Sequence, residues 1–125
     1  MIADADPCLE RIREIALALP GAREKRVVGM PAFYTRRVFA YWGMPFKQDG
    51  GIVCDPQSLA VLLPEPERLA LLQSGRAQVP MYIGPSGWIG LLLGADSDWT
   101  EAAELIEESY RQTAGKRLIA QLEAR

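Results

Sequence analysis

Basic and aromatic side chains concentrate in one stretch of the chain, Arg23–Trp42, which reads REKRVVGMPAFYTRRVFAYW. Guanidinium and ammonium groups attract phosphates, and aromatic rings can stack on bases, so the chemistry open to this stretch is nucleic-acid binding. Between Arg23 and Lys47 there is one acid, Glu24. The same segment holds six cations, which we predict as the nucleic-acid-binding residues: Arg23, Lys25, Arg26, Arg36, Arg37 and Lys47. The alternative is a solvated strand edge, whose charge blocks edge-to-edge aggregation.

Groups for catalysis or metal binding are scarce. The chain contains no histidine, which excludes Ser-His-Asp and Cys-His catalysis and every zinc site built on imidazole. Cys8 and Cys54 fit no metal-ligand spacing, and we expect Cys54 on a buried strand, where a thiol is inert. No nucleophile–base pair can be proposed. We therefore expect a protein that is not an enzyme and needs no metal or cofactor.

Two other motifs each have a functional and a plain interpretation. Five acids and no bases lie between Asp98 and Glu108 and could bind a cation. A tight metal site needs ligands from several elements, so a soluble helix face is favoured.

Gly84–Gly87 is a G-x-x-G loop, which in KH domains clamps a nucleic-acid backbone between two helices. Here it leads into a strand, which favours a turn, although its backbone N–H groups could still face an anion.

Length and composition set the class of protein. A chain of 125 residues with 49% hydrophobic and 24% charged residues is expected to form one domain, residues 1–125, without disulfide or metal staples. No apolar run approaches the roughly 20 residues of a membrane span. With no signal peptide and two unpaired thiols, we expect a cytoplasmic protein that does not engage membranes. The net charge of −2 excludes a uniformly basic surface and suggests a basic patch on an acidic body.

The basic segment is expected to form strands. Glu24–Val28 predicts one strand, and the β-branched and aromatic runs Ala32–Thr35 and Val38–Trp42 predict a hairpin around Arg36-Arg37. Two-residue turns favour Gly or Asn at positive φ, so an Arg-Arg turn should be wider than two residues. Because side chains alternate along a strand, about half of the aromatic rings should be core, leaving one or two exposed.

The other elements follow from caps and periodicity. Asp6-Pro7 predicts a helix start, and Asp98 predicts the cap of a long helix ending near Thr113. The remaining predicted segments are a loop at Gly43–Gly51, a third meander strand at Ile52–Cys54, a short helix from Asp55-Pro56 to Leu63, a helix at Glu65–Gln73, an extended segment at Val79–Ile83, a strand at Trp88–Leu93 that is central or covered on both faces, and a last helix at Lys116–Leu122. This order predicts an α+β fold, a twisted antiparallel sheet (a meander plus a later strand) with helices on one face.

The pattern as a whole resembles the MmcQ/YjbR-like family of small bacterial proteins. The matching residues span about 6–122 and include Leu19-Pro20-Gly21, Gly29–Phe33, Val38-Phe39-Ala40, Cys54-Asp55-Pro56, Tyr82-Ile83-Gly84, Gly87-Trp88, Trp99, Glu104-Leu105, Ser109-Tyr110 and Lys116-Arg117. The resemblance implies a CyaY-like two-layer sandwich, a "double-wing" arrangement and DNA binding. One departure is Arg36-Arg37, where family members usually carry a Gly-Lys turn.

Two functions remain open from the sequence. The first is non-enzymatic DNA binding, with a basic hairpin contacting phosphates. The second is a small-molecule or protein-interaction module without a nucleic-acid role, using a concave sheet face and the Tyr82–Trp88 segment. An iron-binding variant ranks low, because frataxin-type proteins place acids along the first helix and strand, and that region is basic here.

Overall fold

The computed structural model describes residues 6–54 and 56–125, and in these residues five strands form the main antiparallel sheet in the order β1-β2-β3-β6-β7. The strands of this sheet are β1 Arg23–Val27, β2 Met30–Tyr34, β3 Val38–Trp42, β6 Ser58–Leu62 and β7 Trp88–Leu92. A separate two-stranded sheet consists of β4 Phe46–Gln48 and β5 Gly51–Val53. The helices are α1 Pro7–Leu17, α2 Glu65–Gln73, the 3₁₀ helix η1 Gly84–Ser86, α3 Trp99–Thr113 and α4 Lys116–Glu123.

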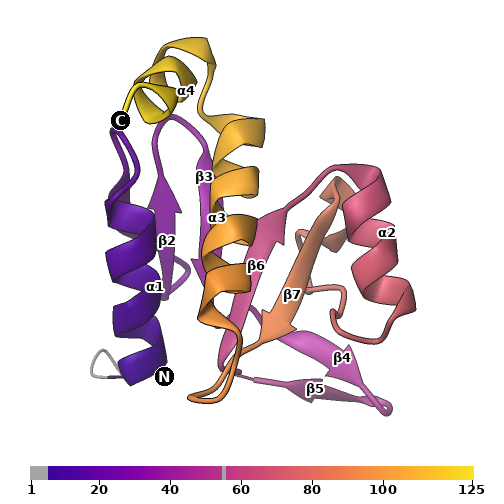
Figure 1. Cartoon of the computed structure of the whole chain (residues 1–125). Coiled ribbons are helices and arrows are strands. Elements are labelled where there is room, and N and C mark those ends of the chain that lie inside the picture. Colours follow the sequence, from indigo (N-terminus) through magenta and orange to yellow (C-terminus); the bar gives the residue numbers. More distant parts are fainter. Residues whose placement is uncertain (1–5, 55) are drawn as a thin grey trace.

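The helices lie on one face of the main sheet (Figure 1). The helices α1 and α3 cover β2, β3 and β6, while α2 lies beside β7 and α4 crosses the end of the β2–β3 hairpin. Their apolar faces enclose a core that includes Ile12, Phe33, Trp42, Ile89 and Ile106, all at most 1% exposed. The predicted α+β architecture is thus confirmed, with an antiparallel sheet backed by helices.

The two helices that pack over the sheet, α1 and α3, begin at the N-cap residues that the sequence predicts. The Asp6 carboxylate accepts the N–H of Cys8 at 2.9 Å, and Pro7 occupies the first position of α1. The Asp98 carboxylate accepts the N–H of Glu101 at 3.0 Å at the start of α3. Each carboxylate satisfies a backbone donor that the helix cannot, which explains why the sequence signal was reliable at these ends.

A β-bulge at Phe39 joins the hairpin to α3. Phe33 pairs with Ala40 and Tyr34 with Val38, so Phe39 has no partner on β2. The extra residue lets Phe39 follow Ala40 into the helix-facing core, where its ring meets that of Tyr110 edge-on at 5.4 Å. The turn beyond contains three residues, 35–37, none at positive φ, which confirms the prediction of a turn wider than two residues.

Next to this bulge, the side chain of Ser109 takes the place of a backbone hydrogen bond between β3 and β6. Pairing between β3 and β6 runs from Trp42↔Leu59 to Ala40↔Val61 and then ends. Beyond it, the Ser109 hydroxyl donates to the carbonyl of Phe39 at 2.6 Å and accepts the N–H of Leu62 at 2.9 Å. The two strands therefore diverge around a buried hydroxyl from α3.

The predicted short helix before Pro64 is wrong. Residues 58–62 form β6, which lies between β3 and β7, and all but Leu62 are buried. A short apolar run buried on both faces carries no helical or strand periodicity, so its leucine spacing was misleading. Asp55, expected to cap that helix, lies outside the described residues.

The prediction for Gly43–Cys54 also needs correction. The expected loop contains β4, and β5 pairs with β4 instead of extending the meander of the main sheet. Asp49 and Gly50 have φ values of 51° and 79°, which is the backbone of a tight hairpin turn. The Asp-Gly pair was therefore a hairpin signal within the predicted loop.

The strand β7 lies at the sheet edge and not at its centre. Gln78 covers that edge through paired backbone hydrogen bonds with Gly90 of 2.8 and 2.9 Å. The segment predicted as extended, Val79–Ile83, turns at residues 81–83, where Tyr82 has a φ of 68°. Among the helices of the described residues, none has both the length and the apolar character needed to cross a bilayer.

Candidate nucleic-acid interface

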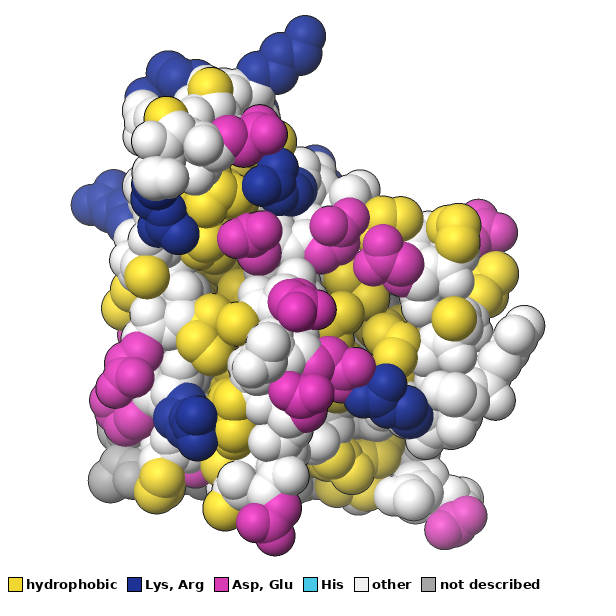
Figure 2. Space-filling view, in the orientation of Figure 1, with side chains coloured by type: hydrophobic (Ala, Val, Ile, Leu, Met, Phe, Trp, Pro, Cys, Tyr) yellow, Lys and Arg dark blue, Asp and Glu magenta, His cyan; other side chains and the backbone are white. Residues whose placement is uncertain are grey.

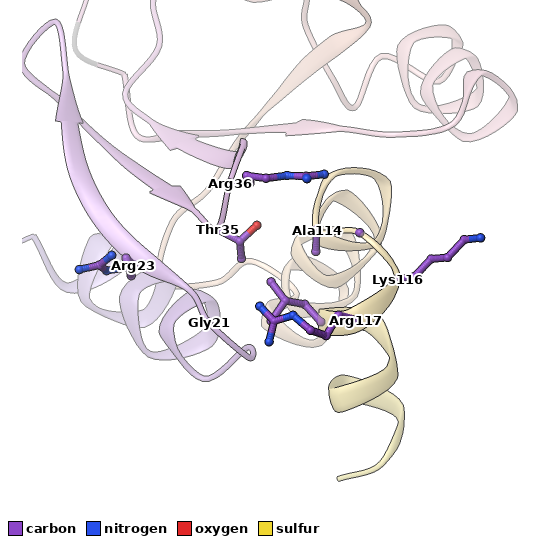
Figure 3. Close-up of a pocket in the computed structure, with 9 residues that line it drawn as sticks. Gly21, Arg23, Thr35, Arg36, Ala114, Lys116 and Arg117 are labelled. Atoms are coloured by element: carbon purple, nitrogen blue, oxygen red, sulfur yellow. The ribbon is translucent and has the colours of Figure 1, made fainter.

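The β2–β3 turn meets the start of α4 around a cavity of about 410 Å³ (Figure 3). Among the described residues, nine line this cavity, and we call it the cationic pocket: Gly21, Arg23, Thr35, Arg36, Ala114, Gly115, Lys116, Arg117 and Leu118. Four of the nine are Arg or Lys, and none is acidic. The pocket thus joins the predicted hairpin tip to the C-terminal region of the chain.

Two glycines and a tyrosine hydroxyl fix the shape of the pocket. Gly115 has a φ of 88° and a ψ of 164°, a backbone conformation open essentially to glycine alone, and it separates α3 from α4 so that the chain changes direction. Gly21 has a φ of 71°, and a Cβ there would lie 3.2 Å from Cδ2 of Leu118. The hydroxyl of Tyr110 donates to the carbonyl of Pro20 at 2.7 Å. The loop after α1 is thereby held against α3 and α4.

The pocket carries positive charge that no carboxylate of the described residues balances at salt-bridge distance. In Figure 3, Arg36 extends across Ala114 and Arg117 points toward Gly21 below Thr35, while Arg23 and Lys116 point outward at the rim. Within residues 6–54 and 56–125, none of these four cations has a carboxylate at salt-bridge distance. The arrangement favours an anion as ligand.

Two local features of the pocket favour an anion as its occupant. Lys116 and Arg117 lie in the first turn of α4, where the positive end of the helix dipole disfavours cations, and Gly115 supplies no side-chain cap. The Thr35 hydroxyl oxygen is buried and has no hydrogen-bond partner. A buried hydroxyl without a partner costs about 1–3 kcal/mol. A phosphate oxygen could accept from both the hydroxyl and the helix N–H groups.

The structure places the six predicted residues at several sites. Arg23 and Arg36 come together at the cationic pocket, and Arg37 lies beside them at the exposed hairpin tip. The other three are distributed elsewhere: Lys25 on the sheet face opposite α1 and α3, Arg26 near the β1–β2 turn, and Lys47 on β4. The Arg26 guanidinium donates to the carbonyl of Gly29 at 3.2 Å. The six cations therefore do not form a single surface.

Lys116 and Arg117 are residues that the site prediction left out. They contribute half of the cations around the pocket, although they are remote in sequence from the hairpin. A signal for them existed in the sequence, because two cations directly after a helix-starting glycine oppose the helix dipole. Such a conflict between local preference and structure often marks a functional site.

The sheet face opposite α1 and α3 carries partly exposed aromatic rings. The side chains of Tyr34, Tyr41 and Trp88 lie there, and the rings of Tyr41 and Trp88 meet edge-on at 5.2 Å. Burial raises the pKa of Tyr41 above its usual value. The remaining aromatic residues of β2 and β3 are buried in the core: Phe33, Trp42 and the bulged Phe39. The expected division of the rings between core and surface is confirmed.

The remaining candidates from the sequence offer no further site. Cys54 is exposed, which corrects its predicted burial, because β5 belongs to the peripheral hairpin. The acidic face of α3 is visible in Figure 2, and there Glu101 pairs with Arg76 and Glu107 with Arg111. Among the described residues, no three His, Cys, Asp or Glu side chains are grouped so that they could hold a metal ion. Gly84–Ser86 forms η1, which leads into β7 as a turn.

Comparison with known proteins gives one match. A family model described as YjbR matches residues 17–112. The matched residues run from the end of α1 through nearly all of α3, so they include the sheet and Arg36 but not Lys116 and Arg117. No curated protein and no solved structure matches the chain.

Proposed function

The chain belongs to the YjbR family, and from this premise we propose that it is a non-enzymatic DNA-binding protein that contacts phosphates at the end of its β2–β3 hairpin. One observation supports this proposal above the others: the cationic pocket gathers four Arg and Lys residues with no acid among its described lining residues. A DNA-binding role also agrees with the cytoplasmic location expected from the sequence.

Each group at the pocket has a defined part in this proposal. Arg36 and Arg117 present planar guanidinium groups, which bind phosphate oxygens through two parallel hydrogen bonds. Arg37 at the tip and Lys116 at the rim contact neighbouring phosphates. Contacts of this kind position a protein on DNA and carry no sequence information. Lys25, Arg26 and Lys47 are outside this cluster, and their contribution stays a prediction.

The salt dependence of DNA binding tests the proposal. If about four phosphates are neutralised, the log–log slope of affinity against salt is about −3.6. Raising salt from 50 to 200 mM should then weaken binding about 150-fold. The measurement is fluorescence anisotropy with a labelled 20-base-pair duplex. Absence of binding at low salt, or binding insensitive to salt, would refute the proposal.

A matched pair of double variants locates the contact. Arg36→Ala with Arg117→Ala should reduce the salt slope by about 2 and weaken binding at least tenfold. The control, Arg11→Ala with Arg68→Ala, removes the same charge from α1 and α2, away from the pocket, and should leave the slope unchanged. Equal losses in the two variants would mean that net charge, and not the pocket, attracts DNA.

The pocket's size favours one alternative. A cavity of about 410 Å³ is large enough for a small phosphorylated molecule. In that case the protein is a small-molecule module, and the same guanidinium groups hold a single phosphate. A thermal-shift screen with inorganic phosphate and nucleotides separates the two functions. A nucleotide that raises the melting temperature, together with no binding of duplex, would favour the alternative.

A further inference from the structure

The face of the main sheet opposite α1 and α3 carries three aromatic side chains that the cationic pocket does not use. Residues paired across antiparallel strands share a face, and this register links Arg23 to Tyr34, and Ala32 to Tyr41. The same register continues from Tyr41 through Ala60 to Gly90. We call this side the open face, because the helices of the described residues pack on the other side, over the core of Phe33 and its neighbours.

The floor of the open face is made of small residues. Ala32, Ala60 and Gly90 occupy its centre, and all three are buried. Tyr41 and Trp88 lie above this floor, in edge-to-face contact across β6. Each of the two rings remains partly exposed. Both rings are thus partly accessible to a ligand.

Cations border these rings on one side. The Lys25 ammonium lies 4.5 Å from the centre of the Tyr34 ring, and Arg23 is paired directly with Tyr34 on the same face. Arg36 follows Tyr34 by two residues, so Tyr34 lies at the end of the hairpin that lines the cationic pocket. Rings next to cations along a groove are how proteins hold single strands, with stacking on bases and charge on phosphates.

We propose that the open face stacks unpaired bases on Tyr34, Tyr41 and Trp88, so that single-stranded DNA is the preferred partner. This inference rests on the proposed function, because the phosphates of the same strand go to Arg23, Lys25 and the cationic pocket. The bases of a duplex are stacked on one another and cannot lie flat on a sheet. Each stacked base is expected to strengthen binding roughly 5- to 150-fold.

Three matched oligonucleotides test the inference at one salt concentration. They are a labelled 20-nucleotide strand, the same strand in a duplex, and a 20-nucleotide strand in which abasic sites replace the central bases. The single strand should bind at least tenfold more tightly than the other two. Equal binding of all three, or tighter binding of the duplex, overturns the inference.

Ring variants identify the surface. Tyr34→Leu and Trp88→Leu should each weaken single-strand binding at least fivefold and leave duplex binding unchanged, whereas Trp88→Phe retains most of the affinity. The control is Tyr82→Leu, which removes a 77% exposed ring outside the strands of the main sheet and should change neither affinity. Tyr34→Leu keeps the test decisive even if Trp88→Leu fails to fold, because Tyr34 lies in β2 next to the edge strand.

The two proposals fail in different ways. If the single strand and duplex bind equally and only Arg36→Ala with Arg117→Ala weakens both, the open face is not a stacking surface and the proposed function stands. If none of the three oligonucleotides binds at low salt, both proposals are overturned. Loss of single-strand affinity in Tyr82→Leu equal to that in Tyr34→Leu would move the stacking surface away from the open face.

Discussion

Replacing Ser109 by alanine should destabilise the protein more than a single lost hydrogen bond suggests. The hydroxyl joins the carbonyl of Phe39 to the N–H of Leu62, where β3 and β6 diverge, and the Ser109 side chain is fully buried. Removing it leaves two backbone groups without a partner. Each buried unpaired group costs about 1–3 kcal/mol. Leu62 is partly exposed, so its N–H lies at the low end of that range.

The magnitude follows from these terms. The two backbone groups left without a partner lower the free energy of unfolding by about 3 kcal/mol together. The better helix propensity of alanine offsets about 0.5 kcal/mol of this loss. We therefore expect Ser109→Ala to lower the free energy of unfolding by about 2–3 kcal/mol. Urea denaturation followed by circular dichroism, with linear extrapolation to water, measures it.

A serine at the C-cap of a helix, Ser74, serves as the control. The hydroxyl of Ser74 donates to the carbonyl of Leu71 at the exposed end of α2, so Ser74→Ala should change the free energy of unfolding by less than about 0.5 kcal/mol. A loss of less than about 0.5 kcal/mol in Ser109→Ala would refute the reasoning. It would mean that the two strands close and bond directly once the hydroxyl is gone.

Three other outcomes are expected. Burial raises the pKa of Tyr110 in the folded protein above the value of about 10 in the unfolded chain. The neutral phenol therefore contributes to the free energy of unfolding in full below about pH 10, and this contribution is lost as pH rises through the folded pKa. Tyr110→Phe should flatten the decline in unfolding free energy measured between about pH 9.5 and 11. A thiol reagent should modify exposed Cys54 in the native protein. It should reach buried Cys8, whose pKa is raised by burial, only on unfolding. Rapid modification of both thiols in the native protein would contradict the structure. Asp98→Ala should cost about 1 kcal/mol by uncapping α3, measured by thermal unfolding, whereas Asp96→Ala should have no effect.

Local chemistry explains which parts of the fold the sequence predicted correctly. The caps Asp6 and Asp98 act on backbone groups two or three residues away, so the signal and the structure lie in the same window. The strands around Arg36-Arg37 were found because aromatic and β-branched residues fill both sides of a short turn. The run at Ser58–Leu62 was misread, because its environment consists of β3 and β7, which are distant in sequence.

The candidate site was only partly predictable for the same reason. Arg23 and Arg36 belong to one basic segment, which composition alone reveals. Their proximity to Arg117 depends on the positive φ of Gly115, which lets α4 turn back over the hairpin end, and on the close approach of Gly21 to Leu118. Sequence periodicity does not predict a contact between residues so far apart in the chain. Alternation along the strands did predict that some rings would be exposed, but not that they share one face.

The short α4 gives the cationic pocket a further property. Eight residues are too few for a stable helix in water, so α4 is helical because Leu118, Ile119 and Leu122 pack against the core and Arg125 donates to the carbonyl of Ala18. Detachment of α4 would dismantle the pocket, since Lys116 and Arg117 leave with it. Any anion held between Arg36 and Arg117 therefore stabilises the attached state by mass action. Amide hydrogen exchange in the last helix would slow as the pocket fills, which makes that helix a thermodynamic reporter of occupancy.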